Sequence, residues 1–325
     1  MACASKIDTR TWPETPSAWL LDDGRRLHLQ QGPIDLIVDA VGGAGQVRIA
    51  YEQAHAAFLS ILDDLANQLP RLRQRLTQQT EVSAFDGDVA QRMTRAAKPF
   101  ADYRVTPMIA VAGAVADHVL CAMVAGRTLE RAQVNNGGDI ALYLSGNACC
   151  SVGICTAPDS SAHSDVISIA RRDGVGGIAT SGWQGRSFSL GIANAVTVLA
   201  ADAATADATA TLIANATDLP GSGKIKRKPA VSLAPDSDLG DRAVTVSVAN
   251  LSEKEIETAL DSGARLAEQF CADHLIISAY LNVQGTSRVI RSDTSDGPLQ
   301  NRTPLAVARM DPIREPIREL EHINL

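Results

Sequence analysis

The feature that most limits what this chain can fold into is a long apolar stretch, Val105 to Gly126, interrupted near its centre by Asp117. The stretch is long enough to cross a membrane, but one Asp at the centre of a spanning helix costs about 2.5–3.5 kcal/mol. Its ends instead carry ordinary helix signals: Thr106 suits an N-cap, Pro107 the first turn and Gly126 a C-cap. We therefore expect a buried helix of a soluble protein, packed closely through its Ala and Gly residues.

The composition favours a soluble, globular chain. Apolar types make up 45% of the 325 residues and charged types 21%, enough for a large core. The 37 acidic and 30 basic residues give a net charge of −7, which argues against nucleic acids and membranes as partners. Six scattered cysteines and an N-terminus without an apolar run predict a reducing, cytoplasmic location.

We expect one domain over residues 1–291 and a C-terminal tail over residues 292–325. The tail carries Pro-Ile-Arg-Glu twice, at 312–315 and 316–319, and prolines four residues apart exclude a continuous helix. The tail either lies along the surface of its own chain or packs on a second subunit. The second possibility predicts a homo-oligomer.

Predicted strands and helices are mixed without regular strand–helix–strand alternation, which favours the α+β class. Strands are predicted at Arg26–Gln30, Ile34–Val41, Arg131–Val134, Ile140–Leu144, Cys150–Ile154, Val166–Ile169, Ala195–Ala200, Ala243–Val248 and Leu275–Val283. Helices are predicted at Gln46–Gln68, ended by Pro70, at Ala201–Ala216, and at Ser252–Ala272, opened by a capping box of Ser252 and Glu255. Residues Leu219–Pro229 are predicted to form a loop.

A Gly-rich turn, Asn135-Asn136-Gly137-Gly138-Asp139, directly follows a predicted strand. Its glycines expose backbone N–H groups, and Asp139 can accept a hydrogen bond from a heterocycle or a sugar. The same residues would also make an ordinary tight turn capped by the Asn side chains. Spacing alone leaves ligand binding and turn formation equally open.

A second Gly-rich segment, Gly176 to Ser187, combines hydroxyl groups with Arg186 and with Trp183, one of three tryptophans. Such a loop suits an anion next to a flat ring, because backbone N–H groups can hold the anion while the indole stacks on the ring. A plain hairpin turn is the alternative.

Asp207 and Thr211 lie four residues apart in an Ala-rich predicted helix, so the carboxylate and the hydroxyl project from one face. Both are oxygen ligands suited to a hard cation such as Mg²⁺, completed by carbonyls, waters and a phosphate. Taken alone, the pair is more typical of a solvated Asp and a Thr bonded to its own backbone.

Taken in order, these segments resemble the ApbE-like superfamily, whose named members are Mg²⁺-dependent FAD:protein FMN transferases. Residues 135–140 are similar to its Asn-Gly-Gly-Asp turn, and residues 179–182 to its Thr-Ser-Gly loop. Asp207-Ala208 with Thr211 matches its D-A-x-x-T metal motif, and residues 109–117 resemble the preceding helix that ends in Asp. The resemblance covers roughly residues 25–290.

The resemblance implies an ApbE-like, T-fold-related architecture in which antiparallel sheets pack with long helices. It implies Mg²⁺ and FAD or FMN as ligands, with Asp207 and Thr211 holding the metal ion. The cofactor would be bound by Asn135, Asn136, Gly137, Gly138, Asp139, Thr180, Ser181, Gly182, Trp183 and Arg186.

Two departures from the named transferases bear on activity. The transferases carry a Lys where this chain has Ala112, and a His-x-x-Asp-Pro-x-Thr-Gly stretch for which the interval 183–193 has neither His nor Pro. Transfer of FMN to a protein hydroxyl needs a base near the acceptor. The chain is therefore similar to an uncharacterised branch of the superfamily, and we expect protein FMN transfer to be absent or very weak.

The leading interpretation is a Mg²⁺-assisted enzyme or binder that acts on a flavin-like or other phosphorylated heterocyclic ligand. Whether it catalyses a reaction stays open. An alternative on the same scaffold is a hydrolase or isomerase of a small cyclic metabolite, using Asp139, Asp117 or Ser187; Asp139 and Ser187 are the predicted catalytic residues. A third possibility is a non-catalytic ligand-binding protein, which the missing Lys and His favour.

Overall fold

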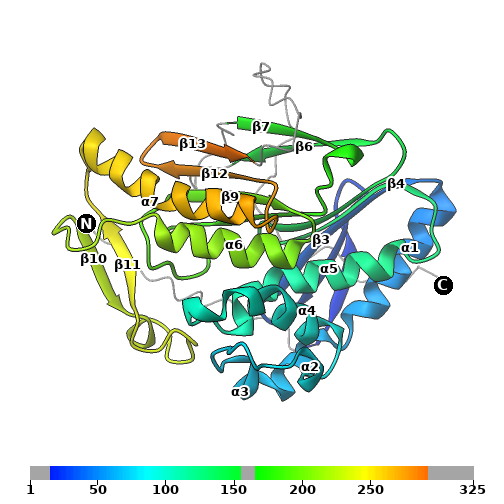
Figure 1. The fold of residues 1–325 in the computed structure, drawn as a ribbon. Coiled ribbons are helices and arrows are strands. Elements are labelled where there is room, and N and C mark those ends of the chain that lie inside the picture. Colours follow the sequence, from blue (N-terminus) through cyan, green and yellow to red (C-terminus); the bar gives the residue numbers. More distant parts are fainter. Residues whose placement is uncertain (1–14, 155–164, 292–325) are drawn as a thin grey trace.

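One long antiparallel sheet organises the protein (Figure 1). The structure, a computed structural model, describes residues 15–154 and 165–291, so the predicted tail lies outside the described residues. All neighbouring strands of the sheet are antiparallel. In spatial order they are β1 (Ser17–Leu20), β2 (Leu27–Gln31), β3 (Ile34–Gly42), β4 (Leu129–Asn136), β5 (Asp139–Leu144), β8 (Gly177–Ser181), β9 (Ala195–Ala200), β12 (Ser278–Val283) and β13 (Thr286–Arg291). The predicted α+β class is confirmed.

Burial along the strands follows their place in the sheet. All six residues of β9 are buried, as expected for a continuous apolar run in the middle of a sheet that is covered on both faces. In β13, at the edge, half-buried and exposed residues alternate instead.

Four helices cover one face of the sheet: α1 (Ala44–Phe58), α5 (Val111–Val124), α6 (Ala203–Ala216) and α7 (Glu253–Ala272) (Figure 1). The main core lies between them and the sheet. A pair of strands, β6 (Cys149–Ile154) and β7 (Asp165–Ala170), covers part of the opposite face over a smaller apolar cluster.

The predicted apolar helix is a core helix. It begins with a 3-10 turn at Pro107–Ala110, where the Met108 N–H donates to Thr106 Oγ1 (3.3 Å), and continues as α5. Among the described residues, Pro107–Val124 is the one helical stretch long and apolar enough to cross a membrane, and 56% of it is buried inside the fold. The burial fits the expectation that this stretch packs within the protein.

The prediction of one helix over Gln46–Gln68 is wrong. The chain turns at Leu59 and Ser60 between α1 and α2 (Ile61–Asn67), so that Ile61 and Leu65 reach the core from a new direction. Pro70 does not end a helix; it sits in the first turn of α3 (Leu69–Leu72), where its missing N–H costs nothing. The sequence reasoning also missed α4 (Asp88–Ala97), which lies beside α5, with α2 and α3 beyond it (Figure 1).

Two predicted loops contain strands. The end of the predicted Leu219–Pro229 loop is β10 (Ile225–Pro229), which pairs with β11 (Ala243–Val248) in a separate two-stranded sheet. The Gly-rich segment begins with β8, an inner strand of the main sheet. A Cβ on Gly177 would lie 2.1 Å from the carbonyl carbon of Asp202, so this glycine allows the close approach of β8 to the start of α6.

Candidate functional site

The site is built where α5 crosses α6. A Cβ on Gly113 would lie 2.1 Å from the Ala203 carbonyl oxygen, so the two backbones nearly touch. Asp117 of α5 accepts hydrogen bonds from the backbone N–H groups of Ala203 (3.0 Å) and Ala204 (2.9 Å). These are orphan N–H groups at the start of α6, and a carboxylate there also complements the helix dipole. Asp117 therefore anchors the N-terminus of α6, and it does not line the pocket described below.

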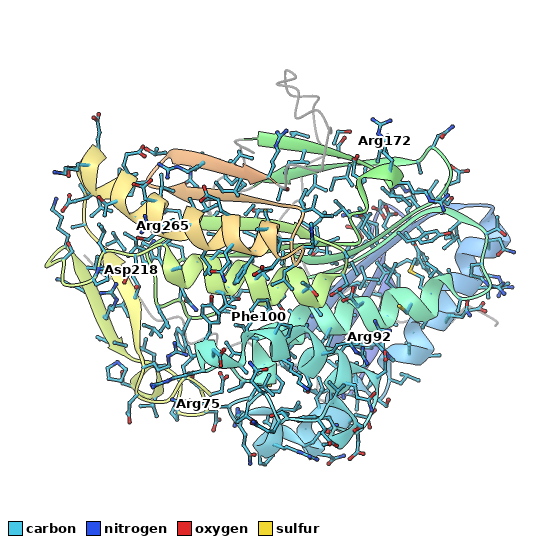
Figure 2. The ribbon with its side chains drawn as sticks, in the orientation of Figure 1. Arg75, Arg92, Phe100, Arg172, Asp218 and Arg265 are labelled. Carbon is cyan, nitrogen blue, oxygen red and sulfur yellow. The ribbon has the colours of Figure 1, made fainter. Side chains whose placement is uncertain are left out.

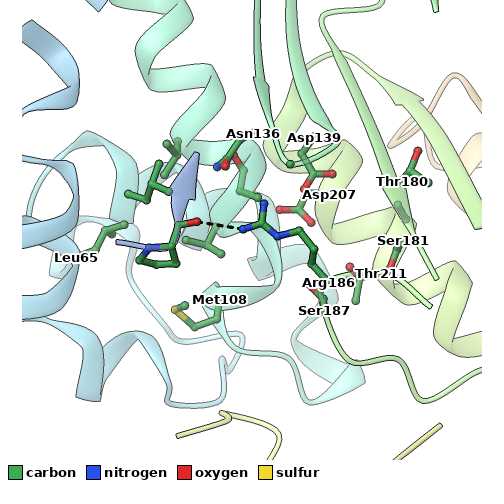
Figure 3. Close-up of a pocket in the computed structure, with 18 of the residues that line it drawn as sticks. Leu65, Met108, Asn136, Asp139, Thr180, Ser181, Arg186, Ser187, Asp207 and Thr211 are labelled. Carbon is green, nitrogen blue, oxygen red and sulfur yellow. Dashed lines mark hydrogen bonds between the residues drawn. The ribbon is translucent and has the colours of Figure 1, made fainter. Parts of the chain in front are cut away.

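The anchored helix presents Asp207 one turn further on. Its Oδ2 accepts a hydrogen bond from the backbone N–H of Gly113 (3.1 Å). Asp139 reaches the same place from the sheet, as the first residue of β5 directly after the turn at Gly137 and Gly138, where φ is 65° and 114°. Figure 3 shows the carboxyl groups of Asp139 and Asp207 facing each other.

Both carboxyl groups line a pocket of about 460 Å³, a volume suited to a small organic ligand. One part of the pocket is polar and the other is an apolar wall. The polar part is lined by Asn136, Gly137, Asp139, Thr180, Ser181, Gly182, Gly185, Arg186, Ser187, Asp207 and Thr211. The wall is made by Pro33, Ile34, Leu62, Leu65, Ala66, Leu69, Met108, Val111, Ala112, Val115 and Ala210, with Arg73 beside it.

The electrostatics of the pair favour a proton or a cation between the two carboxyl groups. Burial raises the pKa of Asp139 to about 7, against the opposing effects of the Thr180 N–H and the Arg186 guanidinium. Burial and the neighbouring Asp139 carboxylate raise the pKa of Asp207 well above its ordinary value. Two ionised carboxylates side by side repel each other, so the ionised pair needs a positive charge close to it.

Arg186 crosses the pocket near this pair. Its guanidinium lies close to the turn, because a Cβ on Gly137 would meet Nη1 at 2.6 Å. Its one hydrogen bond among the described residues is a long one, from Nη2 to the Pro33 carbonyl oxygen (3.4 Å; Figure 3). Most of its N–H donors are therefore available to a ligand.

The structure brings most of the predicted site residues together. Ten of them line the pocket: Asn136, Gly137, Asp139, Thr180, Ser181, Gly182, Arg186, Ser187, Asp207 and Thr211. Asn136 also ties the turn to α5, since its Nδ2 donates to the Ala112 carbonyl oxygen (3.1 Å).

Three predicted residues do not line the pocket: Asn135, Gly138 and Trp183. The side chain of Asn135 accepts a hydrogen bond from the Gly138 N–H (2.8 Å), which is the turn-capping alternative. The backbone N–H of Trp183 bonds to the Ala193 carbonyl oxygen (3.0 Å), and its indole contributes nothing to the lining.

Sequence reasoning missed the apolar wall. Leu62 and Leu65 belong to the apolar face of the helix predicted over Gln46–Gln68, and that pattern alone cannot separate a core residue from a pocket residue. Arg73 gave no signal, because its position depends on the turn after α3.

The residues that line the pocket agree with the two differences from the named transferases that the sequence shows. Its charged side chains are Arg73, Asp139, Arg186 and Asp207, and it includes no Lys and no His from the described chain. Ala112 itself lines the pocket. Within residues 15–154 and 165–291, no group of three or more His, Cys, Asp or Glu side chains is gathered around a common point.

Comparison with known proteins gives matches of two kinds. Curated UPF0280 proteins are similar over part of the chain: that of Methanothermobacter thermautotrophicus is 36% identical over 48% of this chain and 59% of its own length. The Methanopyrus kandleri protein is 39% identical over 44% and 55%. The chain thus spans less than two thirds of the length of these relatives.

Among solved structures, an ApbE protein from Thermotoga maritima matches with a TM-score of 0.39 at 11% identity, over 86% of this chain and 98% of that one. The apo form of the flavinyl transferase ApbE from Pseudomonas stutzeri gives 0.38 at 11% identity, over 87% and 96%. The model of the family described as "AbpE bacteria" matches residues 18–289, most of the chain. The chain belongs to this ApbE-like family.

Proposed function

We propose that the protein binds a flavin-like or other phosphorylated heterocyclic ligand with the help of Mg²⁺. The observation that carries this proposal is the pair of facing carboxyl groups, Asp139 and Asp207, in a pocket that also holds the largely unsatisfied guanidinium of Arg186. Membership of an ApbE-like family supports the same ligand class.

The donor set fits Mg²⁺. This ion prefers one or two carboxylates, with waters and phosphate oxygens completing the shell. Asp139 and Asp207 would supply the carboxylates, and Thr211 a hydroxyl for which the described residues provide no hydrogen-bond partner. A bound ion would offset the mutual repulsion of the carboxylates and neutralise charge on a phosphate.

The two parts of the pocket suit the two parts of such a ligand. The apolar wall would take the ring system, and Arg186, Thr180 and Ser181 would bind the phosphate of the ligand. Asp139, with a pKa of about 7, can hold or release a proton near neutral pH.

Protein FMN transfer is expected to be absent or very weak. Ser187 lines the pocket, but no His of the described chain does, and Ala112 replaces the transferase Lys. Incubation with FAD, Mg²⁺ and a Thr-containing acceptor peptide should leave the peptide unmodified by mass spectrometry. Stoichiometric flavinylation of the peptide would contradict this expectation.

The binding proposal is tested by calorimetric titration of FMN with Mg²⁺ into wild type and Asp207→Asn. The variant should lose about 30-fold to 1,000-fold in affinity, because it removes one charged ligand of the cation (about 2–4 kcal/mol). Asp63→Asn, an exposed carboxylate of α2 outside the pocket, is the matched control and should bind as wild type. Equal affinity in wild type and Asp207→Asn, with and without Mg²⁺, would remove the pair from the binding site.

A further inference from the structure

Arg73 brings a positive charge to the apolar side of the pocket. It directly follows α3, and its N–H donates to the Leu69 carbonyl oxygen (3.0 Å), so it lies one helical turn beyond Leu69 and on the same face. Both residues line the pocket. Figure 3 shows Leu65 and Met108, two further residues of the wall, across the pocket from Ser181. Arg73 therefore lies on the side that would receive the ring of the ligand.

The backbone on both sides of Arg73 is fixed by buried neighbours. Leu72 is completely buried and Leu76 is 5% exposed. The Leu76 N–H also donates to the Val105 carbonyl oxygen (2.9 Å), which ties the segment to the start of the α5 region. Arg73 itself is half-buried, whereas Arg75 is exposed at the surface (Figure 2). Of these two arginines, Arg73 is the one that lines the pocket.

The guanidinium of Arg73 is available to a ligand. Within residues 15–154 and 165–291 it forms no hydrogen bond and no ion pair. Arg71, two residues earlier, donates instead to the Ala84 carbonyl oxygen and lies 4.7 Å from the centre of the Phe85 ring. A half-buried guanidinium beside apolar side chains has lost part of its hydration, so an anion that pairs with it is favoured.

The charges of the lining indicate what kind of anion this is. Asp139 and Asp207 face each other and would share Mg²⁺, and Arg186 lies near them, so the phosphate is bound without Arg73. One guanidinium remains on the side of the ring, and one singly charged group balances it. A carboxylate fits best, because two parallel N–H groups of the planar guanidinium can donate to its two oxygens.

We propose that Arg73 binds a carboxylate group on the ring of the ligand. The ligand is then a phosphorylated heterocycle with an acidic ring substituent, and it binds with its phosphate toward Arg186 and its carboxylate toward Arg73. This inference rests on the proposed function and narrows its ligand class, because the ring of FMN carries no carboxylate and would leave Arg73 without a partner.

The experiment compares nicotinate mononucleotide with nicotinamide mononucleotide, two phosphorylated heterocycles of nearly the same shape that differ in a ring carboxylate and a ring carboxamide. Calorimetric titration into the full chain with Mg²⁺ should show about tenfold tighter binding of nicotinate mononucleotide to wild type, through a charge-assisted hydrogen bond. Arg73→Gln should remove this preference and leave the affinity for nicotinamide mononucleotide unchanged. Arg75→Gln, an exposed arginine of the same segment, is the matched control and should keep the preference.

Free nicotinate and free nicotinamide, which lack the phosphate, separate this inference from the metal-binding function. Saturation-transfer NMR without Mg²⁺ should detect nicotinate on wild type and on Asp207→Asn, but not on Arg73→Gln, and should not detect nicotinamide. This result without Mg²⁺-dependent nucleotide binding would contradict the proposed function and leave the carboxylate site standing.

Thermal melts check the fold, and Arg73→Gln should melt as wild type because its guanidinium has no partner to lose. Equal affinity of wild type for the two nucleotides would overturn the carboxylate site. The same preference in Arg73→Gln, a nicotinate signal that survives Arg73→Gln, or no binding of any of the four compounds would also overturn it.

Discussion

Asp117 and Asp207 lie on opposite sides of one helix crossing and accept hydrogen bonds in a reciprocal arrangement. Asp117 of α5 binds the backbone of α6, and Asp207 of α6 binds the backbone of α5. Asp117 has both oxygens matched to N–H groups of its neighbour. Asp207 instead faces a second carboxyl group, Asp139, across the pocket (Figure 3).

The difference separates a structural carboxylate, Asp117, from Asp207, which we propose as a cation ligand. Burial raises the pKa of Asp117 to about 6, although hydrogen bonds from two N–H donors stabilise its ionised form and oppose this increase. Asp207 also accepts from backbone N–H groups of α5, at Gly113 and Ala112, but the neighbouring Asp139 carboxylate adds to the effect of burial and raises its pKa further. Substitutions at the crossing should therefore divide into those that affect folding and those that affect ligand binding.

Gly113→Ala should have the largest effect, because it disturbs both carboxylates at once. Its Cβ would meet the Ala203 carbonyl at 2.1 Å, and a helix backbone cannot give way as a flexible side chain can. We expect a loss of about 3 kcal/mol or more in unfolding free energy by urea titration, together with weaker ligand binding. Gly45→Ala, in α1 with open space around it, is the control and should stabilise the protein slightly. A fully stable Gly113→Ala protein would contradict the close crossing.

Asp117→Ala should have the second-largest effect, and it should lower the stability of the fold without changing ligand binding. It leaves the buried N–H groups of Ala203 and Ala204 without an acceptor, which costs about 2–3 kcal/mol in unfolding free energy. Asp117→Asn keeps one acceptor and should lose less. Ligand affinity of the folded variants, measured by calorimetry, should stay within about threefold of wild type. A variant of normal stability with abolished binding would make Asp117 a site residue.

Thr211→Val should have the smallest effect and should affect binding alone. Loss of the hydroxyl should weaken Mg²⁺-dependent ligand binding about fivefold, roughly 1 kcal/mol, with no change in Tm. The matched control is Thr209→Val on the same helix, whose hydroxyl bonds to the Thr205 carbonyl (2.6 Å). If both variants weaken binding equally, the hydroxyl of Thr211 has no special role.

The sequence allowed the polar half of the site to be predicted, because its residues lie in short local motifs. The Gly137-Gly138 turn projects Asp139, and the four-residue spacing places Asp207 and Thr211 on one helix face. The apolar wall could not be predicted, since Leu62, Met108 and Val111 come from separate elements that meet only after folding.

Two of the sequence errors arise from contacts with backbone groups that lie far away in the sequence. Gly177 was assigned to a flexible loop, but it lacks a side chain because the backbone at Asp202 occupies that space. Composition cannot distinguish a glycine needed for close packing from one needed for a turn. The anchoring role of Asp117 was hidden in a similar way, because its partners are backbone groups of a helix that begins 86 residues further along the chain.

The proposed cation-binding pair of Asp139 and Asp207 is tested most directly by thermal melts between pH 6 and 8. The Tm of protein stripped of metal ions is measured first without and then with added Mg²⁺. The pKa of Asp139 is raised from 3.8 to about 7 in the fold, so the stability contributed by its proton is present at acid pH and lost as the pH rises through 7. Wild type should therefore melt at lower temperature at pH 8 than at pH 6. Mg²⁺ should restore Tm mainly at pH 8, and Asp139→Asn should remove the Mg²⁺ effect and weaken the pH dependence, which Asp207 alone would then carry. A Tm independent of pH and Mg²⁺ in wild type, or the same response in Asp139→Asn, would contradict the claim.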